Sequence, residues 1–374
     1  MPKIKSSGAP RAGTEAAIKR LSRSNYVLSA AVLVLAIALI FTILAFSSSI
    51  SSIKTEISNL HFSSSSNSST VPSYNITGNL IVPPTSIPSD PVITKQMPFG
   101  SRLTNINQPL NATDLAVINN APNSYFETAG EMLLNGSLVN FASGKGSSVV
   151  PPFIVNGKPS TIYLGSITCV FCGENRWAMA LALSRFGTFS RLYKGYSSFG
   201  DHDLPTLYWS PAQYNQSAED LGAFYNSSYI NFISIDDANP ITGGFVLNPM
   251  GTIQSRINAT NNTVYIDAMK FIVQLNNFQG TPYTIWGKYN VAGADAVDFG
   301  NSTPTNNTLP MTNMTHASVF KQLANPTDQF ALTEYAGADI YAAMMCSTLN
   351  GTTTNMPSIC SLPAIKGIEN SEGI

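Results

Sequence analysis

One stretch decides how this 374-residue chain folds: Thr161-Ile162-Tyr163-Leu164-Gly165-Ser166-Ile167-Thr168-Cys169-Val170-Phe171-Cys172-Gly173-Glu174-Asn175-Arg176-Trp177. Its first part is a β-branched and aromatic run, which is typical of a buried strand. Two cysteines at C-x-x-C spacing follow a Ser/Thr-flanked turn, and a helical sequence follows them. This order predicts a strand, a turn and a helix, with Cys169 at the N-terminus of the helix.

A thiol at that place is suited to disulfide exchange. The unpaired N–H groups and the positive end of the helix dipole stabilise a thiolate, and the thiolate is the attacking species. We therefore predict that Cys169 attacks and that Cys172, three positions on, resolves the mixed disulfide. Three other interpretations stay open: an inert disulfide staple, half of a zinc site, and copper transfer through two thiolates.

The flanking sequence predicts a fold of class α/β. A strand at 153–158 runs into an Asn156-Gly157 turn, and the return strand is 161–164. The helix after the dithiol carries Trp177, Ala180, Leu181 and Ser184 along one face. Other helices are expected at 114–118 (capped by Asn111), 125–134, 267–278 and 329–349, and other strands at 205–209, 229–235 and 244–249. The segment 280–289 is expected to hold a loop with Pro, a strand, a Gly-containing turn and the start of a second strand.

A second motif leads to a family. Gly280-Thr281-Pro282 comes long after the dithiol and precedes a strand and a Gly-Lys-Tyr turn. The order of C-x-x-C and Thr-Pro resembles the thioredoxin superfamily, in variants with an insertion between the C-x-x-C helix and the proline loop. The resemblance implies a central sheet flanked by helices, with Pro282 as a cis proline beside the dithiol and Thr281 as the residue whose backbone pairs with substrate. An ordinary trans Thr-Pro bond is the alternative.

A narrower resemblance covers roughly residues 110–360. Tyr163-Leu164-Gly165, Glu174-x-Arg176-Trp177 and the segment 182–189 resemble an archaeal family of membrane-anchored thioredoxin-like proteins without assigned function. The chain departs from the thioredoxin pattern between the cysteines, where it has Val170-Phe171 rather than a proline, and before them, where Thr168 replaces a common Trp. Because these residues influence redox poise, the direction of electron flow stays open.

The N-terminal part predicts a membrane anchor. Residues 26–46 carry no charge and are long enough to span the hydrocarbon core of a bilayer, and the basic segment 1–25 before them is expected to stay in the cytoplasm. The predicted localisation is a single-pass protein of the cell membrane, with its main domain extracytoplasmic. A cleaved signal peptide is the alternative, although the apolar run is longer than such segments usually are.

Composition supports an exterior location. Half of the residues in 47–70 are serine, so we expect 47–102 to be a Ser/Pro-rich stalk, followed by a helical extension at 103–152, a thioredoxin-like domain at 153–360 and a tail at 361–374. Asn-x-Ser/Thr acceptors recur from Asn67 to Asn350, all after the apolar run, and are candidate sites for N-glycans. The alternative is that a chain rich in Asn, Ser and Thr contains such acceptors by chance. Only 11% of the residues are charged, which also suits an acidic exterior.

The remaining cysteines and histidines give further expectations. The simplest of three connectivities pairs Cys346 with Cys360 as a structural disulfide. The three histidines (His61, His202 and His316) are too scattered for a metal site, and we expect each to be a surface or loop residue. No metal and no cofactor is predicted. A net charge of −1 gives no reason to expect nucleic acid as a partner.

These observations predict a membrane-tethered, extracytoplasmic thiol–disulfide oxidoreductase whose partners are protein thiols or disulfides. The competing hypothesis is a non-catalytic, glycosylated cell-surface protein for binding or structure that retains the fold. That hypothesis requires a buried, inert disulfide between Cys169 and Cys172.

Overall fold

The structure is a computed structural model, and it describes the residues 74–80, 106–138, 141–142, 148–167, 169–197, 204–211, 223–237, 261–276, 282–292, 298–299, 311 and 314–374. The predicted basic segment 1–25, the anchor 26–46 and most of the stalk lie outside these residues, as do Thr281 and the strand predicted at 244–249. Within the described ranges, no helix is both long and apolar enough to cross a membrane.

The described elements confirm the α/β class. The helices are α3 (Ala112–Asn119), α4 (Asn123–Leu134), α5 (Val170–Leu183), α7 (Thr263–Asn276), α8 (His316–Leu323), α9 (Gln329–Leu349), the 3-10 helix η4 (Ser358–Ser361) and α10 (Pro363–Glu372). The strands are β1 (Tyr74–Ile76), β2 (Phe141–Ala142), β3 (Ser148–Val149), β4 (Phe153–Val155), β5 (Lys158–Ser166), β6 (Thr188–Phe189), β7 (Tyr193–Tyr196), β8 (Pro205–Tyr208), β9 (Tyr225–Asn226), β10 (Asn231–Asp237), β11 (Tyr283–Trp286), β12 (Tyr289–Ala292) and β13 (Asp298–Phe299).

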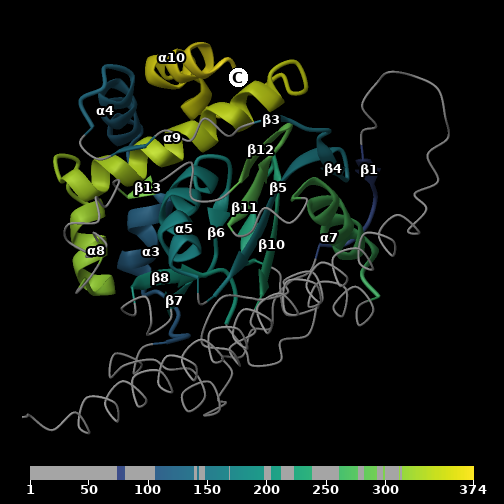
Figure 1. Cartoon of the computed structure of the whole chain (residues 1–374), viewed down its shortest axis with the longest axis horizontal. Coiled ribbons are helices and arrows are strands. Elements are labelled where there is room, and N and C mark those ends of the chain that lie inside the picture. The colour runs from purple at the N-terminus through teal and green to yellow at the C-terminus, as the bar shows by residue number, and fades with distance from the viewer. Residues whose placement is uncertain are drawn as a thin grey trace, which may run out of the picture. The chain divides into compact units, whose positions relative to one another are not determined.

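Strand β5 is the centre of a mixed sheet. It pairs in parallel with β10 and antiparallel with β11, and β11 continues the sheet through β12 to β3. The predicted hairpin before β5 is confirmed, because Asn156 and Gly157 both have positive φ, at 51° and 76°, as a two-residue turn requires. The sheet lies between α5 on one side and α7 on the other (Figure 1).

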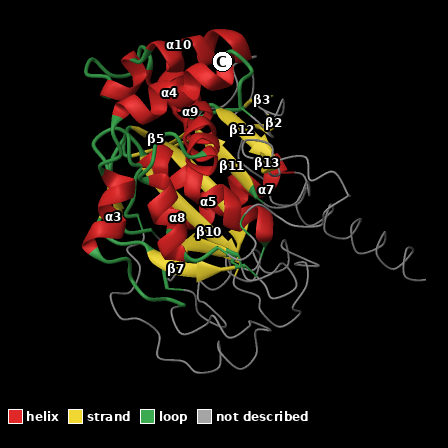
Figure 2. Ribbon diagram, turned by 90° about the vertical axis from the view of Figure 1, so that its left-hand side faces the viewer, coloured by secondary structure: helices red, strands yellow, loops and turns green. Residues whose placement is uncertain are grey.

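Helix α5 differs from the one-faced helix that we expected. All of its residues except Phe171 are buried, including the charged Glu174 and Arg176. The reason is that it is enclosed on every side: the sheet lies beneath it, β8 lies beside it, and α9 covers it (Figure 2). The Tyr341 hydroxyl of α9 donates to Oδ1 of Asn175 at 2.7 Å, which fastens these two helices together.

The other predicted helices are confirmed with small differences at their ends. Asn111 caps α3 by accepting from the N–H of Asp114 at 2.8 Å, as predicted. Helix α9 occupies the predicted range 329–349, with Asp328 as its cap. The helix predicted at 267–278 begins four residues earlier, at Thr263.

Two expectations need correction. The segment 361–374 is not merely a tail: α10 starts with Pro363 at its first position and buries Ala364, Ile365 and Ile368. This helix was not predicted because it is short, has few apolar residues and is otherwise polar. His316 is not a surface residue, because it is only 4% exposed at the start of α8, and burial lowers its pKa to about 4. His61 and His202 lie outside the described residues.

Candidate dithiol site

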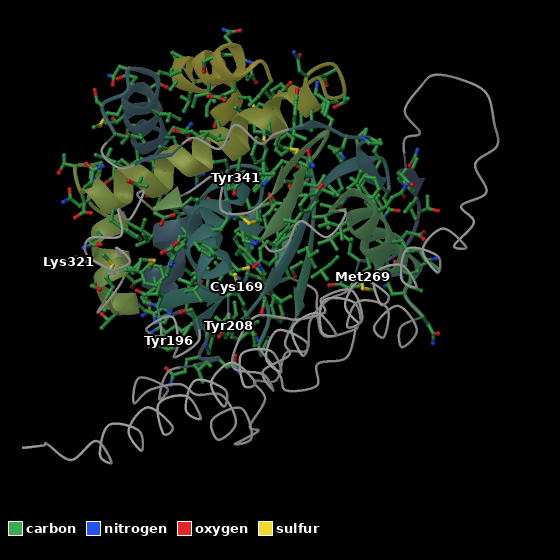
Figure 3. The ribbon with its side chains drawn as sticks, viewed as in Figure 1. Cys169, Tyr196, Tyr208, Met269, Lys321 and Tyr341 are labelled. Atoms are coloured by element: carbon green, nitrogen blue, oxygen red, sulfur yellow. A yellow bond between two sulfur atoms is a disulfide. The ribbon has the colours of Figure 1, made fainter. Side chains whose placement is uncertain are left out.

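The site lies where β5 ends and α5 begins. Cys169 is the cap residue of α5, with extended backbone angles, and its sulfur accepts a hydrogen bond from the N–H of Cys172 at 3.3 Å. Cys169 is partly exposed while Cys172 is fully buried, and both are free thiols in this structure. Figure 3 shows Cys169 in the same region of the domain as Tyr208. The more exposed sulfur therefore has the helix N-terminus behind it, as the sequence predicted.

The sheet register brings distant residues to this end of β5. Gly165, near the end of β5, pairs with Asp236 of β10. On the other side, Tyr283 of β11 pairs with Leu164, so the preceding Pro282 lies level with Gly165. The structure thus brings the buried Pro282 to the end of the sheet from which Cys169 emerges, whereas Thr281 lies outside the described residues.

A buried ion pair stands next to the dithiol. Nη2 of Arg176, which is completely buried, lies 2.7 Å from Oδ1 of Asp236 and also donates to the carbonyl oxygen of Ser166 at 3.0 Å. The guanidinium carbon lies 5.5 Å from the ring centre of Tyr163 and 5.7 Å from that of Tyr208. Burial by itself lowers the pKa of Arg176, but Asp236 and its other neighbours outweigh burial and raise it, so the guanidinium stays charged.

Tyr163 lies along β5 and covers Gly165. A Cβ on Gly165 would meet the hydroxyl oxygen of Tyr163 at 1.8 Å, so the tyrosine needs the glycine beneath it. That hydroxyl is buried and has no hydrogen-bond partner among the described residues. Burial raises the pKa of this hydroxyl well above the ordinary value; the charge of Arg176 opposes that shift, while Asp236 and the two cysteines add to it. The side chain is therefore a neutral hydroxyl close to both thiols.

Burial raises the pKa of the Cys172 thiol well above its ordinary value, and its interaction with Cys169 raises it further. Two groups act in the opposite direction, namely the charge of Arg176 and the N–H of Ser166, which donates to the Cys172 sulfur at 3.4 Å. The two thiols thus have different environments, one reachable and at the helix end, the other enclosed. That asymmetry is what an attacking and a resolving thiol require.

Strand β8 holds the start of α5 in place. The Thr206 hydroxyl donates to the carbonyl oxygen of Gly173 at 2.6 Å, and Nε1 of Trp177 donates to that of Pro205 at 3.1 Å. Nε2 of the buried His316 lies 2.8 Å from the carbonyl oxygen of Thr206, which fixes β8 in turn. These bonds tie the first turns of α5 to its surroundings, so the dithiol sits on a well-supported helix.

The site includes residues that sequence reasoning missed. Arg176 belonged to the stretch that carried the resemblance, but no role was predicted for it, and Asp236 was not singled out. Asp236 could have been found from its position directly after the strand Ile233-Ser234-Ile235. Parallel strands end at the same edge of a sheet, so an acidic residue at that place lies near the end of β5. Phe171, between the cysteines, is 44% exposed and presents an apolar side chain next to Cys169 in the chain.

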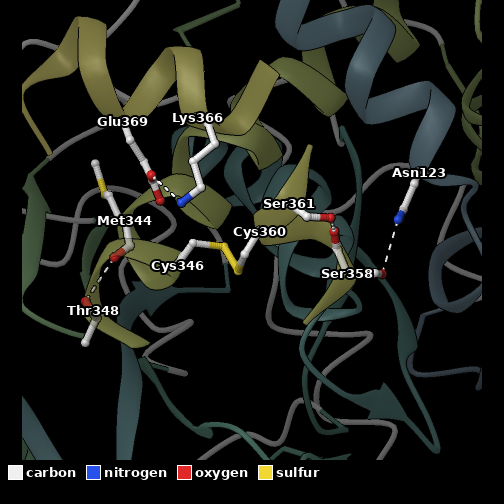
Figure 4. The surroundings of a disulfide bond; sticks show 9 residues. All are labelled: Asn123, Met344, Cys346, Thr348, Ser358, Cys360, Ser361, Lys366 and Glu369. Atoms are coloured by element: carbon white, nitrogen blue, oxygen red, sulfur yellow. Dashed lines mark hydrogen bonds and ion pairs between the residues drawn. A yellow bond between two sulfur atoms is a disulfide. The ribbon is translucent and has the colours of Figure 1, made fainter. Parts of the chain in front are cut away.

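The second pair of cysteines forms a disulfide between Cys346 and Cys360, which joins the end of α9 to η4 (Figure 4). It is part of the covering helices and takes no part in the dithiol site. In the ranges that the structure describes, no three His, Cys, Asp or Glu side chains are grouped so that they could hold a metal ion.

We expect Gly165→Ala to destabilise the site strongly. The new methyl group would overlap the hydroxyl and the ring of Tyr163, with Cζ only 2.1 Å away. Overpacking of this kind costs about 1–3 kcal/mol or more. Thermal unfolding measures the loss, and Gly173→Ala is a matched control because its methyl group would meet Thr206 at an ordinary 3.5 Å. Equal melting temperatures for the two variants would contradict the packing described here.

Comparison with known proteins finds one family. The family described as "Domain of unknown function (DUF929)" matches residues 150–347, which include the dithiol, Arg176, Asp236, Pro282 and Cys346 and amount to more than half of the chain. No curated protein and no solved structure matches the chain.

Proposed function

The chain belongs to the DUF929 family, and from the geometry of its dithiol we propose that it is a thiol–disulfide oxidoreductase that acts on protein substrates. The observation that carries the proposal is the asymmetry of the two sulfurs. Cys169 caps the helix, is partly exposed and accepts the N–H of Cys172, whereas Cys172 is buried three residues later. This is the arrangement of an attacking thiol and a resolving thiol.

The topology supports a thioredoxin-like fold for the domain. If the short strands β6 to β9 and β13 and the helix α8 are left out, the order of elements is β5, α5, β10, α7, β11, β12 and α9, with β10 and β11 on either side of β5. A thioredoxin-like domain has this strand–helix–strand unit followed by an antiparallel pair and a helix. In such a domain Pro282 and Thr281 belong to the loop that binds the backbone of the substrate. The segment between β6 and β9 then corresponds to the predicted insertion.

The proposed reaction is a balanced exchange of disulfides. The Cys169 thiolate attacks one sulfur of a substrate disulfide, that disulfide breaks, and the other substrate sulfur leaves and takes a proton. Cys172 then loses its proton and attacks the Cys169 sulfur, so the protein disulfide forms and the second substrate thiolate leaves and is protonated. The substrate gains two electrons and the dithiol loses them. For a further turnover in this direction, an external thiol reduces the protein disulfide back to the dithiol. In the reverse direction, the protein disulfide oxidises two substrate thiols and becomes the dithiol, and an external disulfide then reoxidises it.

We further propose that this chemistry takes place outside the cytoplasm, with the protein tethered by residues 26–46. The support is in the sequence: an uncharged apolar run preceded by a basic segment, and glycan acceptors that follow it. The substrates are then extracytoplasmic protein thiols or disulfides. The disulfide between Cys346 and Cys360 is consistent with an oxidising compartment.

The deciding experiment compares two single substitutions in the reduction of a model protein disulfide by dithiothreitol. We expect Cys169→Ser to abolish the activity, because the attacking sulfur is lost. For Cys172→Ser, the protein is reduced first and the dithiothreitol is removed before substrate is added. We then expect it to keep the first step and to accumulate a mixed disulfide on Cys169, which mass spectrometry detects as substrate linked to the protein.

Each variant serves as the control for the other, since both remove one sulfur from the same turn. Unchanged activity in Cys169→Ser would contradict the proposal. A wild-type protein that shows no exchange, and whose Cys169 and Cys172 form an unreactive disulfide, would favour the non-catalytic surface protein.

A further inference from the structure

The exchange proposed above assigns no role to the Arg176–Asp236 ion pair. This ion pair nevertheless lies next to Cys172, the buried thiol that must lose its proton before it can attack the mixed disulfide. We propose that Arg176, held by Asp236, is the positioning residue that enables Cys172 to resolve the mixed disulfide, because its charge stabilises the Cys172 thiolate at the moment of attack. This inference rests on the proposed function and adds a residue to it.

Ser166 connects the guanidinium to the thiol. Its N–H donates to the Cys172 sulfur at 3.4 Å, and its carbonyl oxygen accepts from Nη2 of Arg176 at 3.0 Å. Cys172 and Arg176 are also four residues apart on α5, so they lie on the same face of the helix. One backbone unit at the end of β5 therefore holds the cation next to the sulfur.

Other ionisable groups surround the thiol from each neighbouring element. Cys169 caps α5 and Arg176 belongs to it, and the others are Tyr163 on β5, Tyr208 on β8 and Asp236 on β10. Burial raises the pKa of both tyrosines, which are therefore neutral. Arg176 and Asp236 form the ion pair of this cluster, and Arg176 is the partner that favours an ionised Cys172.

The second half of the exchange explains why a cation is needed there. Cys172 is completely buried, and burial opposes the loss of its proton. The carboxylate of Asp236 is bound to Arg176. An opposite charge within about 4–6 Å lowers the pKa of an acid by about 1–3 units, which compensates for part of the burial. The proton leaves for the departing thiolate, while Arg176 keeps its own protons and its charge throughout.

The experiment separates the two steps by their products. The full-length protein, with Cys169 and Cys172 reduced, reacts with one equivalent of 5,5′-dithiobis(2-nitrobenzoate). The attack by Cys169 releases one coloured thiolate, and the attack by Cys172 on the resulting mixed disulfide releases the second. Cys172→Ser, which cannot make the second attack, defines the amplitude of the first phase.

The central comparison is between Asp236→Asn and the double variant Arg176→Met/Asp236→Asn, which differ only in the cation. Arg176→Met alone is left out because the unpaired carboxylate of Asp236 would by itself disfavour the Cys172 thiolate. Asp236→Asn leaves the buried Arg176 without its carboxylate, so its stability is measured as well. Thermal unfolding shows that each variant is folded at the assay temperature. Both phases are followed as a function of pH.

We expect the double variant to leave the first phase unchanged and to slow the second about 3- to 30-fold below its pH midpoint. Each unit of increase in the pKa of Cys172 reduces the thiolate fraction tenfold, but a thiolate of higher pKa is about threefold more nucleophilic, so the net loss is about threefold per unit. Compared with the wild-type protein, the pH midpoint of the second phase should be higher in the double variant and lower in Asp236→Asn. Loss of packing alone would not move the midpoints in opposite directions.

The outcomes of this experiment are distinct. If the wild-type protein releases no coloured thiolate in the first phase, the proposed function itself fails. If the first phase is normal and the second has the same rate and midpoint in both variants, only the role of Arg176 is overturned. If the double variant does not fold, the test of Arg176 rests on the pH midpoint of the second phase in Asp236→Asn. A midpoint equal to or higher than that of the wild-type protein would overturn the inference.

Discussion

At neutral pH, the variants Glu334→Gln and Asp339→Asn are each expected to be more stable than the wild-type protein, and the gain should disappear in acid. Both carboxyl groups belong to α9, both are completely buried, and neither forms an ion pair among the described residues. A buried carboxylate without a cation is costly, so the folded protein keeps these groups protonated.

The surroundings of Glu334 disfavour its charge. Burial raises its pKa well above the ordinary 4.5, and the nearby carboxyl group of Glu174 on α5 raises it further, while a backbone interaction with Ala178 opposes them. Two acidic side chains therefore meet between α5 and α9, where the helices are packed. A neutral amide at position 334 keeps the size of the side chain and removes the group that must be protonated.

Asp339 is enclosed on the other side of α9. Neither of its carboxyl oxygens has a hydrogen-bond partner in the described structure, and a Cβ on Gly130 of α4 would come within 3.0 Å of one of them. Burial raises its pKa well above the ordinary 3.8, and the charge of Glu127 acts in the same direction. Glu127 itself accepts from the N–H of Ala364 in the first turn of α10, at 3.3 Å.

The direction of the pH dependence follows from the raised pKa values of Glu334 and Asp339. A carboxyl group whose pKa is raised by folding stabilises the protein fully below its unfolded pKa, near 4, and the contribution is lost as the pH rises toward the folded pKa. Above its unfolded pKa, each carboxyl group that stays protonated in the folded protein costs about 1.4 kcal/mol more for each pH unit. The gain in each variant should therefore grow as the pH rises from 4 to 7.

Chemical denaturation between pH 4 and pH 7 measures the effect as the difference in unfolding free energy between variant and wild type. The buried His316, whose pKa is lowered to about 4, destabilises the protein in acid, but it is present in both proteins and cancels in the difference. Glu131→Gln, on the exposed face of α4, is the matched control and should change little. A difference that does not depend on pH would contradict the protonation of these groups.

The second large effect concerns the disulfide between Cys346 and Cys360. We expect Cys346→Ala/Cys360→Ala to lower the unfolding free energy by about 3 kcal/mol, the value typical of a closed loop of about 15 residues. The bond joins the last turn of α9 to η4, and α10 follows directly. Both cysteines are buried, so their loss also removes packing.

The contacts around the disulfide show which part of the protein depends on it. The side-chain amide of Asn123, at the start of α4, donates to the Ser358 hydroxyl of η4 at 3.2 Å (Figure 4). Gly130 and Ala364 pack closely where α4 meets α10. Helix α10 thus rests on α4 and α9 and is fastened by the disulfide. Without that bond, we expect α10 to be the first element to separate, and Asp339 to become hydrated.

Hydrogen exchange measures this directly, with faster exchange in α10 than in β5 after the disulfide is removed. The gain in unfolding free energy from Asp339→Asn should also be smaller when it is made in Cys346→Ala/Cys360→Ala. In that background Asp339 is hydrated, so its replacement by a neutral amide removes a smaller cost. Cys169→Ala, which removes a partly exposed thiol, is the control and should leave exchange in α10 unchanged. If α10 exchanges at the same rate with and without the disulfide, the disulfide does not hold α10 in place.

The sequence by itself determined the local elements around the dithiol. The alternation of the strand, the Asn156-Gly157 turn and the place of Cys169 at the helix start are properties of neighbouring residues, and short-range patterns describe them well. The long helix at 329–349 was equally clear, since its apolar residues and cap are continuous in the chain.

Only the tertiary structure decided what surrounds the sulfurs. Asp236 reaches Arg176 because β10 pairs with β5 in a particular register, and Glu334 meets Glu174 because α9 crosses α5; neither fact is contained in any local pattern. The burial of α5 on all sides likewise comes from its partners and not from its own periodicity. Residue types near the motif determined that the chain carries a dithiol, whereas strand pairing and helix packing decided which charges act on it.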